Sequence, residues 1–171
     1  MLGKLISFLA VTSLFAGCHL SGASPSRELA AGIAHVKLNH STDDKAPIPL
    51  GDRLTIVNLF DEFAPGCPTG NRFETMERLN SLRPAGITIL VIFSDKHFSA
   101  QDLENFKAIL PMADSLDRGD IEPIRPHLTE GKLLIVLDAK GNIIWHEKPN
   151  TSEQEVFSEL SRLINAMSNK V

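Results

Sequence analysis

The residue of this sequence best suited to chemistry is Cys67, in the stretch FDEFAPGCPTGNRF of residues 60–73. A cysteine thiolate is a strong nucleophile, so a single thiol can attack a peroxide or form a mixed disulfide with another protein. The chain has two cysteines, Cys18 and Cys67, in very different surroundings. Cys67 is therefore the candidate nucleophile, and its reactivity depends on what lies beside it.

Turn-forming residues surround Cys67 on both sides. Pro65 and Gly66 are a strong turn pair, because proline presets one backbone angle and glycine accepts positive φ. Pro68 suits the first position of a helix, where its missing N–H costs nothing. We therefore expect a helix to start at about residue 68 with Cys67 at its cap, where the positive helix end favours the thiolate.

Several titratable residues are candidate neighbours of Cys67. His97, in the loop SDKHFS, follows a predicted strand and should reach the same sheet edge, where it could accept the thiol proton or remain a surface histidine. Asp61 and Glu62 flank the turn. Carboxylates near a thiol raise its pKa, so these two oppose activation unless they point to water.

Composition argues against several other functions. The net charge is −4, no basic block is present, and the chain has one Trp and no Tyr, so we expect no nucleic-acid partner. His35 and His40 lack two further convincing ligands, so no metal site is expected. No glycine-rich phosphate loop is present either, and we expect no cofactor.

The elements that would position Cys67 can be predicted from hydrophobic patterning. The order is strand, helix, strand, helix, an irregular stretch, a β-hairpin and a final helix, over residues 54–60, 72–82, 87–93, 99–110, 111–131, 132–147 and from 151 or 152. Residues 33–50 suggest a loose hairpin before the first long strand. The parallel crossover and the closing antiparallel pair predict an α/β fold, a three-layer α/β/α sandwich with a mixed sheet.

The N-terminus has the pattern of a secretory signal. Residues 5–17 form an uncharged run of 13 residues after Lys4, which is short for a membrane span. The sequence LFAGC resembles the lipobox of bacterial lipoproteins, with Phe15 in place of the usual Leu. The resemblance implies a signal peptide over residues 1–17 and a lipid on Cys18; the alternative is a plain signal peptide.

A lipidated Cys18 has consequences for location and for the thiol count. The resemblance implies several acyl chains, which would anchor the protein to a membrane of the bacterial envelope, with its domain outside the cytoplasm. We expect a tether over residues 18–32 and one domain over residues 33–171. Cys67 would then be the single thiol of the mature domain, in an oxidising compartment.

Three stretches resemble the thioredoxin-like superfamily, over roughly residues 33–168. TIVNLF resembles the strand that leads to the active site, GCPTGNRF occupies the active-site turn, and KLLIVLDAKGNIIWHE resembles the late hairpin. One alignment matches Ala64-Pro65-Gly66-Cys67 to the family's C-x-x-C, so Ala64 replaces the nucleophilic cysteine and Cys67 lies inside the first helical turn. The other matches Cys67-Pro68-Thr69 to the peroxidatic CPT of peroxiredoxins.

The start of the late hairpin separates these relatives further. Thioredoxins have a cis-proline there, whereas this sequence has Lys132, and peroxiredoxins commonly have an Arg. Lys132 is thus either a cation that favours the Cys67 thiolate or a solvated lysine at a strand start.

Two functions are consistent with the sequence. The first is a one-cysteine thiol oxidoreductase or peroxidase that acts through Cys67 and is recycled by an external thiol. The alternative is a redox-inactive thioredoxin-like binding module for an envelope partner, favoured by Ala64 and by the missing proline.

Overall fold

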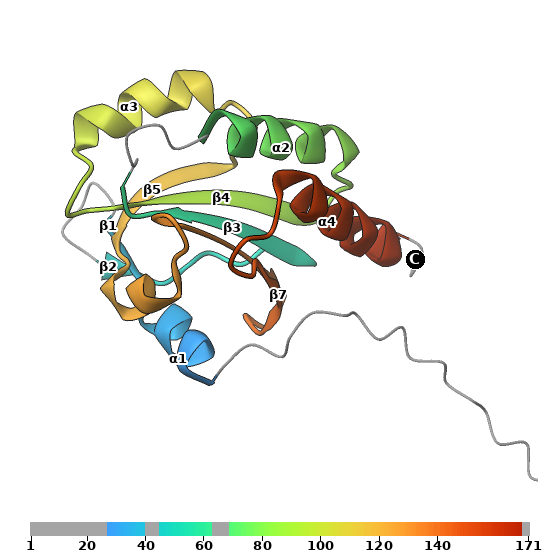
Figure 1. The fold of residues 1–171 in the computed structure, drawn as a ribbon, viewed down its shortest axis with the longest axis horizontal. Helices are drawn as coiled ribbons and strands as arrows, with labels where there is room; N and C mark the ends of the chain where they lie inside the picture. The colour runs from blue at the N-terminus through green and yellow to red at the C-terminus, as the bar shows by residue number, and fades with distance from the viewer. Residues whose placement is uncertain (1–26, 40–44, 63–68, 169–171) are drawn as a thin grey trace, which may run out of the picture.

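A seven-stranded mixed sheet is the centre of the computed structural model, which describes residues 27–39, 45–62 and 69–168 (Figure 1). The strand order across the sheet is β2-β1-β5-β4-β3-β6-β7. In chain order the strands are β1 (Lys37–Asn39), β2 (Lys45–Ala46), β3 (Leu54–Phe60), β4 (Ile87–Ser94), β5 (Ser115–Asp120), β6 (Lys132–Asp138) and β7 (Ile143–His146).

The sequences of the two central strands, β3 and β4, are continuous apolar runs because both faces of these strands are covered. Every residue of β3 is buried, and so are seven of the eight residues of β4. β3 pairs parallel with β4 and antiparallel with β6, so that Phe60 lies opposite both Phe93 and Lys132. The carboxyl end of β3 and the start of β6 therefore meet at one edge of the sheet.

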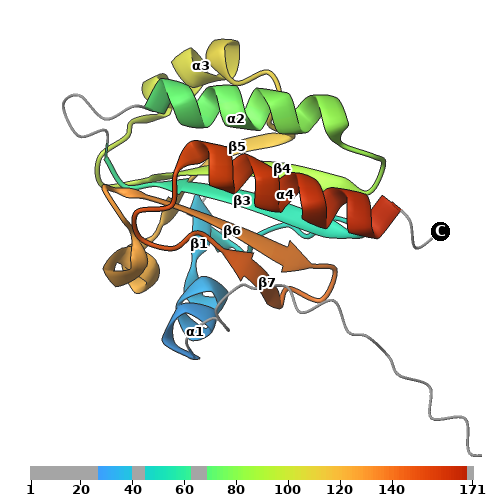
Figure 2. The same cartoon turned by 45° about the vertical axis from the view of Figure 1, so that its right-hand side comes forward.

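Three helices cover one face of the sheet, as Figure 2 shows: α2 (Thr69–Leu82), α3 (Ala100–Ile109) and α4 (Glu153–Ser168). Met76 and Leu79 of α2 and Leu160 of α4 pack on this face against residues such as Ile56 of β3. Ser99 caps α3, since its side chain accepts from the backbone N–H of Asp102 in a capping box. α4 begins at Glu153, close to the predicted start.

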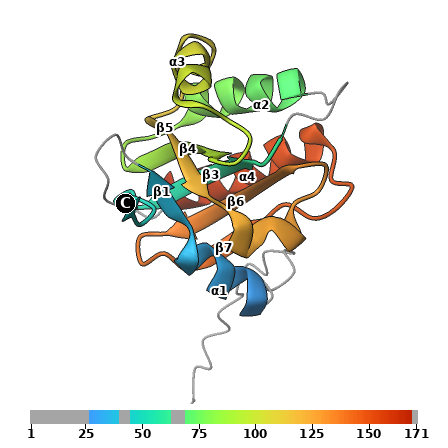
Figure 3. The ribbon, with the colours of Figure 1, turned by 90° about the vertical axis from the view of Figure 1, so that its left-hand side faces the viewer.

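The opposite face is covered by α1 (Arg27–His35) and the 3-10 helix η1 (Glu122–His127), which lie together below the sheet in Figure 3. Leu29 and Ile33 of α1 are buried against Ile124 of η1 and the sheet. Gly32 lets the two helices approach closely, because a Cβ at that position would lie 2.6 Å from the carbonyl oxygen of Pro123. The predicted three-layer α/β/α sandwich with a mixed sheet is confirmed.

The prediction of a tether through residue 32 is wrong from residue 27 onward, because α1 occupies residues 27–35 and belongs to the packed fold. The predicted hairpin after residue 33 is correct only in part. Its strands are short, β1 and β2, and they pair antiparallel. The irregular stretch 111–131 contains both β5 and η1.

No helix in the described ranges is both long enough and apolar enough to cross a membrane. The predicted signal peptide and Cys18 lie outside the described residues.

Candidate functional site

Cys67 and its turn lie outside the residues that the structure describes, so the choice between a cap position and the first helical turn stays a prediction. The flanking elements are well defined. β3 ends at Phe60, and α2 is described from Thr69, two residues after Cys67 in the sequence. The site is therefore built from the side chains at the sheet edge where the chain leaves β3 and enters α2.

A buried charge network lies on the helical side of this edge. Its centre is Arg72 of α2, whose side chain is fully buried. Arg72 Nη2 donates to Glu147 Oε1 at 2.6 Å, just beyond β7, and Nε donates to both oxygens of Glu153 at 2.9 and 3.0 Å. Nη1 donates to Asn58 Oδ1 of β3 at 3.3 Å. One arginine thus joins α2, α4, β3 and the end of β7.

Lys132 belongs to the same network. Its Nζ donates to Glu153 Oε1 at 3.2 Å, and its side chain is 10% exposed. The interpretation of Lys132 as a solvated lysine is therefore wrong. Its place opposite Phe60 puts a buried cation beside the carboxyl end of β3. That this cation lies beside the Cys67 thiol stays a prediction.

The network also shifts the pKa values of Arg72 and Glu153. Burial alone would raise the pKa of the Glu153 carboxyl, but the hydrogen bond and charge of Arg72, followed by those of Lys132, hold it below its ordinary value. Burial alone would lower the pKa of Arg72, but Glu153 and Glu147 raise it. Both shifts favour the charged forms of Arg72 and Glu153.

A second charge cluster lies on the η1 side of the same edge. Asp61, directly after β3, is buried, and its Oδ1 accepts from Arg125 Nη2 at 3.0 Å. Arg125 Nε lies 3.0 Å from Glu122 Oε2, which also pairs with Lys96 Nζ at 2.6 Å. Asp61 therefore does not point freely to water, and Arg125 compensates its charge.

The weak candidate His97 belongs to this second cluster. Its Nε2 lies 3.7 Å from Asp61 Oδ1, and its side chain is 40% exposed. The neighbouring Asp95 accepts from Asn39 Nδ2 at 2.7 Å. Glu62 is exposed. The structure thus brings His97 to Asp61, and a contact between His97 and Cys67 stays a prediction.

Sequence reasoning missed Arg72, Glu147 and Glu153 as site residues. One signal was present: Arg72, Met76 and Leu79 follow helical spacing, so an arginine stands on the apolar stripe of α2. Phe73, the next residue of the helix, is only half-buried. The two carboxylates that Arg72 binds, Glu147 and Glu153, are 75 and 81 residues away in the sequence. No local pattern could therefore have indicated them.

An aromatic cluster packs beside the network. Phe93 of β4 stacks on Phe60 at 5.5 Å and on Phe106 of α3 at 4.7 Å between ring centroids. Phe60 also contacts Phe73 of α2 edge to face at 5.7 Å, and Phe98 lies 4.9 Å from Phe93. These rings make the surroundings of the edge apolar, which strengthens nearby electrostatic interactions.

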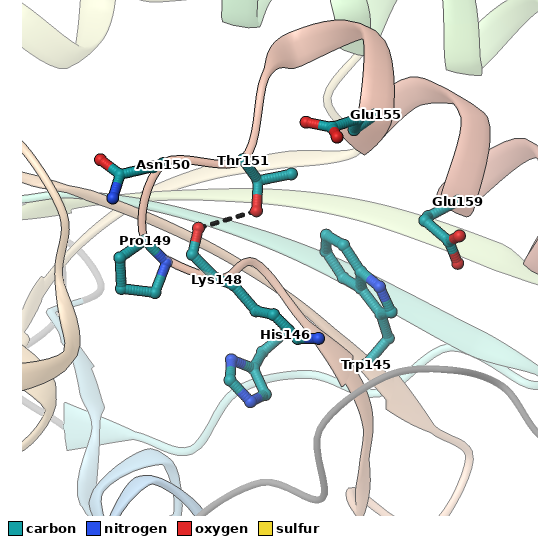
Figure 4. A pocket seen from close by; sticks show the side chains of 8 residues that line it. All are labelled: Trp145, His146, Lys148, Pro149, Asn150, Thr151, Glu155 and Glu159. Carbon is teal, nitrogen blue, oxygen red and sulfur yellow. Dashed lines mark hydrogen bonds between the residues drawn. The ribbon is translucent and has the colours of Figure 1, made fainter.

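A cavity of about 300 Å³ lies between the end of β7, the following loop and α4 (Figure 4). Trp145 faces Glu159 of α4 across it, and Thr151 Oγ1 donates to the carbonyl oxygen of Lys148. None of the predicted site residues lines this cavity. The described residues also contain no group of three or more His, Cys, Asp or Glu placed to hold a metal ion.

No protein-family model and no curated protein matches the sequence. Solved structures do match: a thiol-disulfide isomerase from Corynebacterium glutamicum has a TM-score of 0.55 at 13% identity, over 75% of this chain and 92% of that one. The Xanthomonas campestris bacterioferritin comigratory protein has a TM-score of 0.55 at 12% identity, over 86% and 98%. A domain of a possible thiol-disulfide isomerase from Cytophaga hutchinsonii has 0.53 at 14% identity, over 78% and 91%. Together with the order and pairing of its strands and helices, these matches show that the chain has the thioredoxin-like fold.

Proposed function

We propose that this protein is a thiol oxidoreductase or peroxidase of the bacterial envelope that acts through Cys67 and is anchored by a lipid on Cys18. The observation that supports it most is the buried cation Lys132, registered opposite Phe60 and sharing Glu153 with Arg72 of α2. The chain therefore leaves β3 and returns as α2 beside two buried cations. A nearby cation favours the thiolate form of a cysteine.

The chemistry needs one protein thiol and two external reactants. The Cys67 thiolate attacks one peroxide oxygen, the O–O bond breaks, and the products are a sulfenic acid and an alcohol or water. An external thiol then attacks the sulfenic sulfur, which releases water and forms a mixed disulfide. A second external thiol breaks that disulfide and restores Cys67. The external thiol is required because no second cysteine stands in the mature domain.

Two neighbours in fold support this choice of chemistry. The Xanthomonas protein is described by its alkyl peroxide reduction activity, and the Corynebacterium protein is a thiol-disulfide isomerase. Peroxide reduction and thiol-disulfide exchange are thus both associated with the fold that this chain shares. The envelope location rests on the lipobox-like sequence before Cys18.

The second candidate function is a redox-inactive binding module for an envelope protein. The charge balance of the network favours it, since the two cations Arg72 and Lys132 are matched by the two carboxylates Glu147 and Glu153. Ala64 in place of a first cysteine favours it as well. A fully compensated network would leave the Cys67 thiol near its ordinary pKa.

The two functions differ in the reactivity of one thiol. In a Cys18→Ala background Cys67 is the only thiol, so its alkylation rate against pH gives its pKa, and mass spectrometry after peroxide treatment detects the sulfenic acid. An enzyme should show a pKa clearly below about 8.5 and rapid oxidation that Cys67→Ser abolishes. A thiol that titrates at or above that value and oxidises slowly would contradict the enzyme and favour the redox-inactive binding module.

The anchor has a separate test. Cys18→Ala should move the protein from the membrane fraction to the soluble fraction of disrupted cells, and it should abolish labelling by a radioactive fatty acid. Continued membrane association of this variant would contradict the lipid anchor without touching the proposal for Cys67.

A further inference from the structure

We propose that the cavity between β7, the following loop and α4 binds a small zwitterion, of the class of a free amino acid with an apolar side chain. Its volume of about 300 Å³ is at the lower end of the range for sites that hold one small molecule. All of its lining residues belong to the described parts of the chain. A ligand here would be independent of the thiol chemistry proposed for Cys67.

Opposite charges line two sides of this cavity. Glu155 and Glu159 stand on α4, whereas Lys148 stands on the loop after β7 (Figure 4). Among the described residues Lys148 Nζ has no carboxylate as an ion-pair partner, so the charges of the two sides are not joined across the cavity. A molecule with one positive and one negative group would pair with both sides at once.

The carboxylates on the α4 side are held in place by their own neighbours. Glu155 Oε2 accepts from the backbone N–H of Ser152 at 2.8 Å and from the Ser152 hydroxyl at 2.7 Å. The backbone bond, followed by the hydroxyl bond, lowers the pKa of Glu155 from its ordinary value, which keeps the carboxylate charged. Glu159 Oε2 accepts from Arg162 Nη2 at 2.6 Å. In both residues Oε1 has no donor within the described ranges and is left for a ligand ammonium.

The loop that carries Lys148 is closed without a ligand. The backbone N–H of Thr151 donates to the carbonyl oxygen of Lys148 at 3.2 Å, and Thr151 Oγ1 donates to the same oxygen at 2.8 Å. The preceding residue, Glu147, is buried and paired with Arg72. The backbone of Lys148 is therefore fixed on both sides. A wall that is formed in advance lowers the ordering cost of binding.

Trp145 supplies the apolar wall between the two charged sides. It is only 6% exposed, and its ring faces Glu159 in Figure 4. A buried indole N–H usually has a hydrogen-bond partner, yet that of Trp145 has no acceptor in the parts of the chain that the structure describes. An apolar side chain of a ligand can pack on the ring, and a ligand oxygen can accept from the N–H. These features favour an amino acid over a simple ammonium or carboxylate ion.

The only tryptophan of the chain lines this cavity, so its fluorescence reports on occupancy. Titration of the full chain with L-leucine should give a saturable change in tryptophan fluorescence. Two analogues of leucine each lack one charge: isopentylamine has no carboxylate, and isocaproate has no ammonium. Both should bind at least about tenfold more weakly than leucine, because each can pair with only one side of the cavity.

Two variants of accessible residues assign each charge of the ligand to one side. Lys148→Gln should raise the Kd of leucine at least about fivefold and leave that of isopentylamine unchanged. Glu159→Gln should raise the Kd of leucine in the same way and leave that of isocaproate unchanged. Glu104→Gln is the matched control and should change neither, because Glu104 forms a similar exposed pair with Lys107 on α3 and does not line the cavity.

Equilibrium dialysis with radiolabelled leucine repeats the measurement without fluorescence. Absence of saturable leucine binding up to about 10 mM in both measurements overturns the proposal. Binding that Lys148→Gln and Glu159→Gln both leave unchanged also overturns it, because the ligand then lies elsewhere. An analogue that binds as tightly as leucine would show that the cavity recognises a single charge instead of a zwitterion. None of these outcomes bears on the reactivity of Cys67, which has its own test.

Discussion

The two charge clusters at this edge of the sheet contain similar residues but are built differently. The network of Arg72, Lys132, Glu147 and Glu153 is largely buried, and Arg72 contacts two carboxylates from separate elements. In the cluster of Asp61, Lys96, His97, Glu122 and Arg125, only Asp61 is buried, while the other side chains are 37% to 52% exposed. The comparison shows that solvent exposure determines how much the loss of one partner of an ion pair lowers stability. Water can solvate the remaining charge at an exposed pair but not at a buried one.

The largest expected effect is the removal of the buried guanidinium. Arg72→Met should lower the free energy of unfolding by about 3–5 kcal/mol, because the buried carboxylate of Glu147 loses its ion-pair partner and Glu153 keeps only Lys132. Urea denaturation followed by circular dichroism measures it. Arg78→Met is the matched control on the same helix: Arg78 lies at the surface over the ring of Phe157 at 3.9 Å, and its loss should cost about 1 kcal/mol or less. Equal losses in the two variants would contradict the buried network.

The two clusters should also differ, by a smaller amount, in how they make the free energy of unfolding depend on pH. The pKa of Glu153 is lower in the folded protein than its ordinary value of 4.5, so its contribution to stability is present above that value and is lost as pH falls through the lowered folded value. The free energy of unfolding of Glu153→Gln should therefore fall less steeply than that of wild type below pH 4.5, as measured by urea denaturation at a series of pH values.

The corresponding residue of the surface cluster is the control for this pH dependence. The pKa of Glu122 is also lowered, chiefly by its hydrogen bond to Lys96, but this side chain is 51% exposed to solvent. Glu122→Gln should change the pH profile only at low ionic strength, because salt screens exposed charges. A change in the Glu122→Gln profile that persists in 1 M NaCl would contradict the distinction between the clusters.

The smallest expected effect is the loss of the exposed guanidinium. Arg125→Met should lower the free energy of unfolding by about 1 kcal/mol or less, since half-exposed ion pairs contribute little. The cost should shrink further in 1 M NaCl, whereas the cost of Arg72→Met should stay nearly constant. A loss as large as that of Arg72→Met would show that the pair of Asp61 and Arg125 behaves as a buried ion pair.

The sequence predicted the centre of the sheet well and its margins poorly. β3, β4 and β6 are continuous apolar runs, and their bounds agree with the prediction to within one residue because burial on both faces leaves a strong local pattern. α1 was missed because it follows a small polar stretch and has only Leu29 and Ile33 as buried large apolar residues. The apolar spacing of that pair, four residues apart, was the available signal.

The candidate site was predicted less completely than the fold. Lys132 was found through its place at the start of the late hairpin, which is a local feature. Its partners were not found, since hydrogen bonds such as that of Arg72 to Glu147 depend on how distant elements pack. Charged residues in a helix are usually surface residues, so the one local sign that Arg72 is buried was its place on the apolar stripe of α2.

The position of α1 limits how far the folded domain could lie from a lipid anchor at Cys18. The first described residue of the fold is Arg27, nine residue steps after Cys18, so with Cys18 in a membrane the distance from the anchor to α1 is at most about 30 Å. A tether continuing to residue 32 would have allowed about 20 Å more. The domain would thus be confined to a thin layer next to the lipid. The anchored domain would contact molecules that are embedded in the same membrane or bound to its surface. Molecules elsewhere in the compartment would have to diffuse to it.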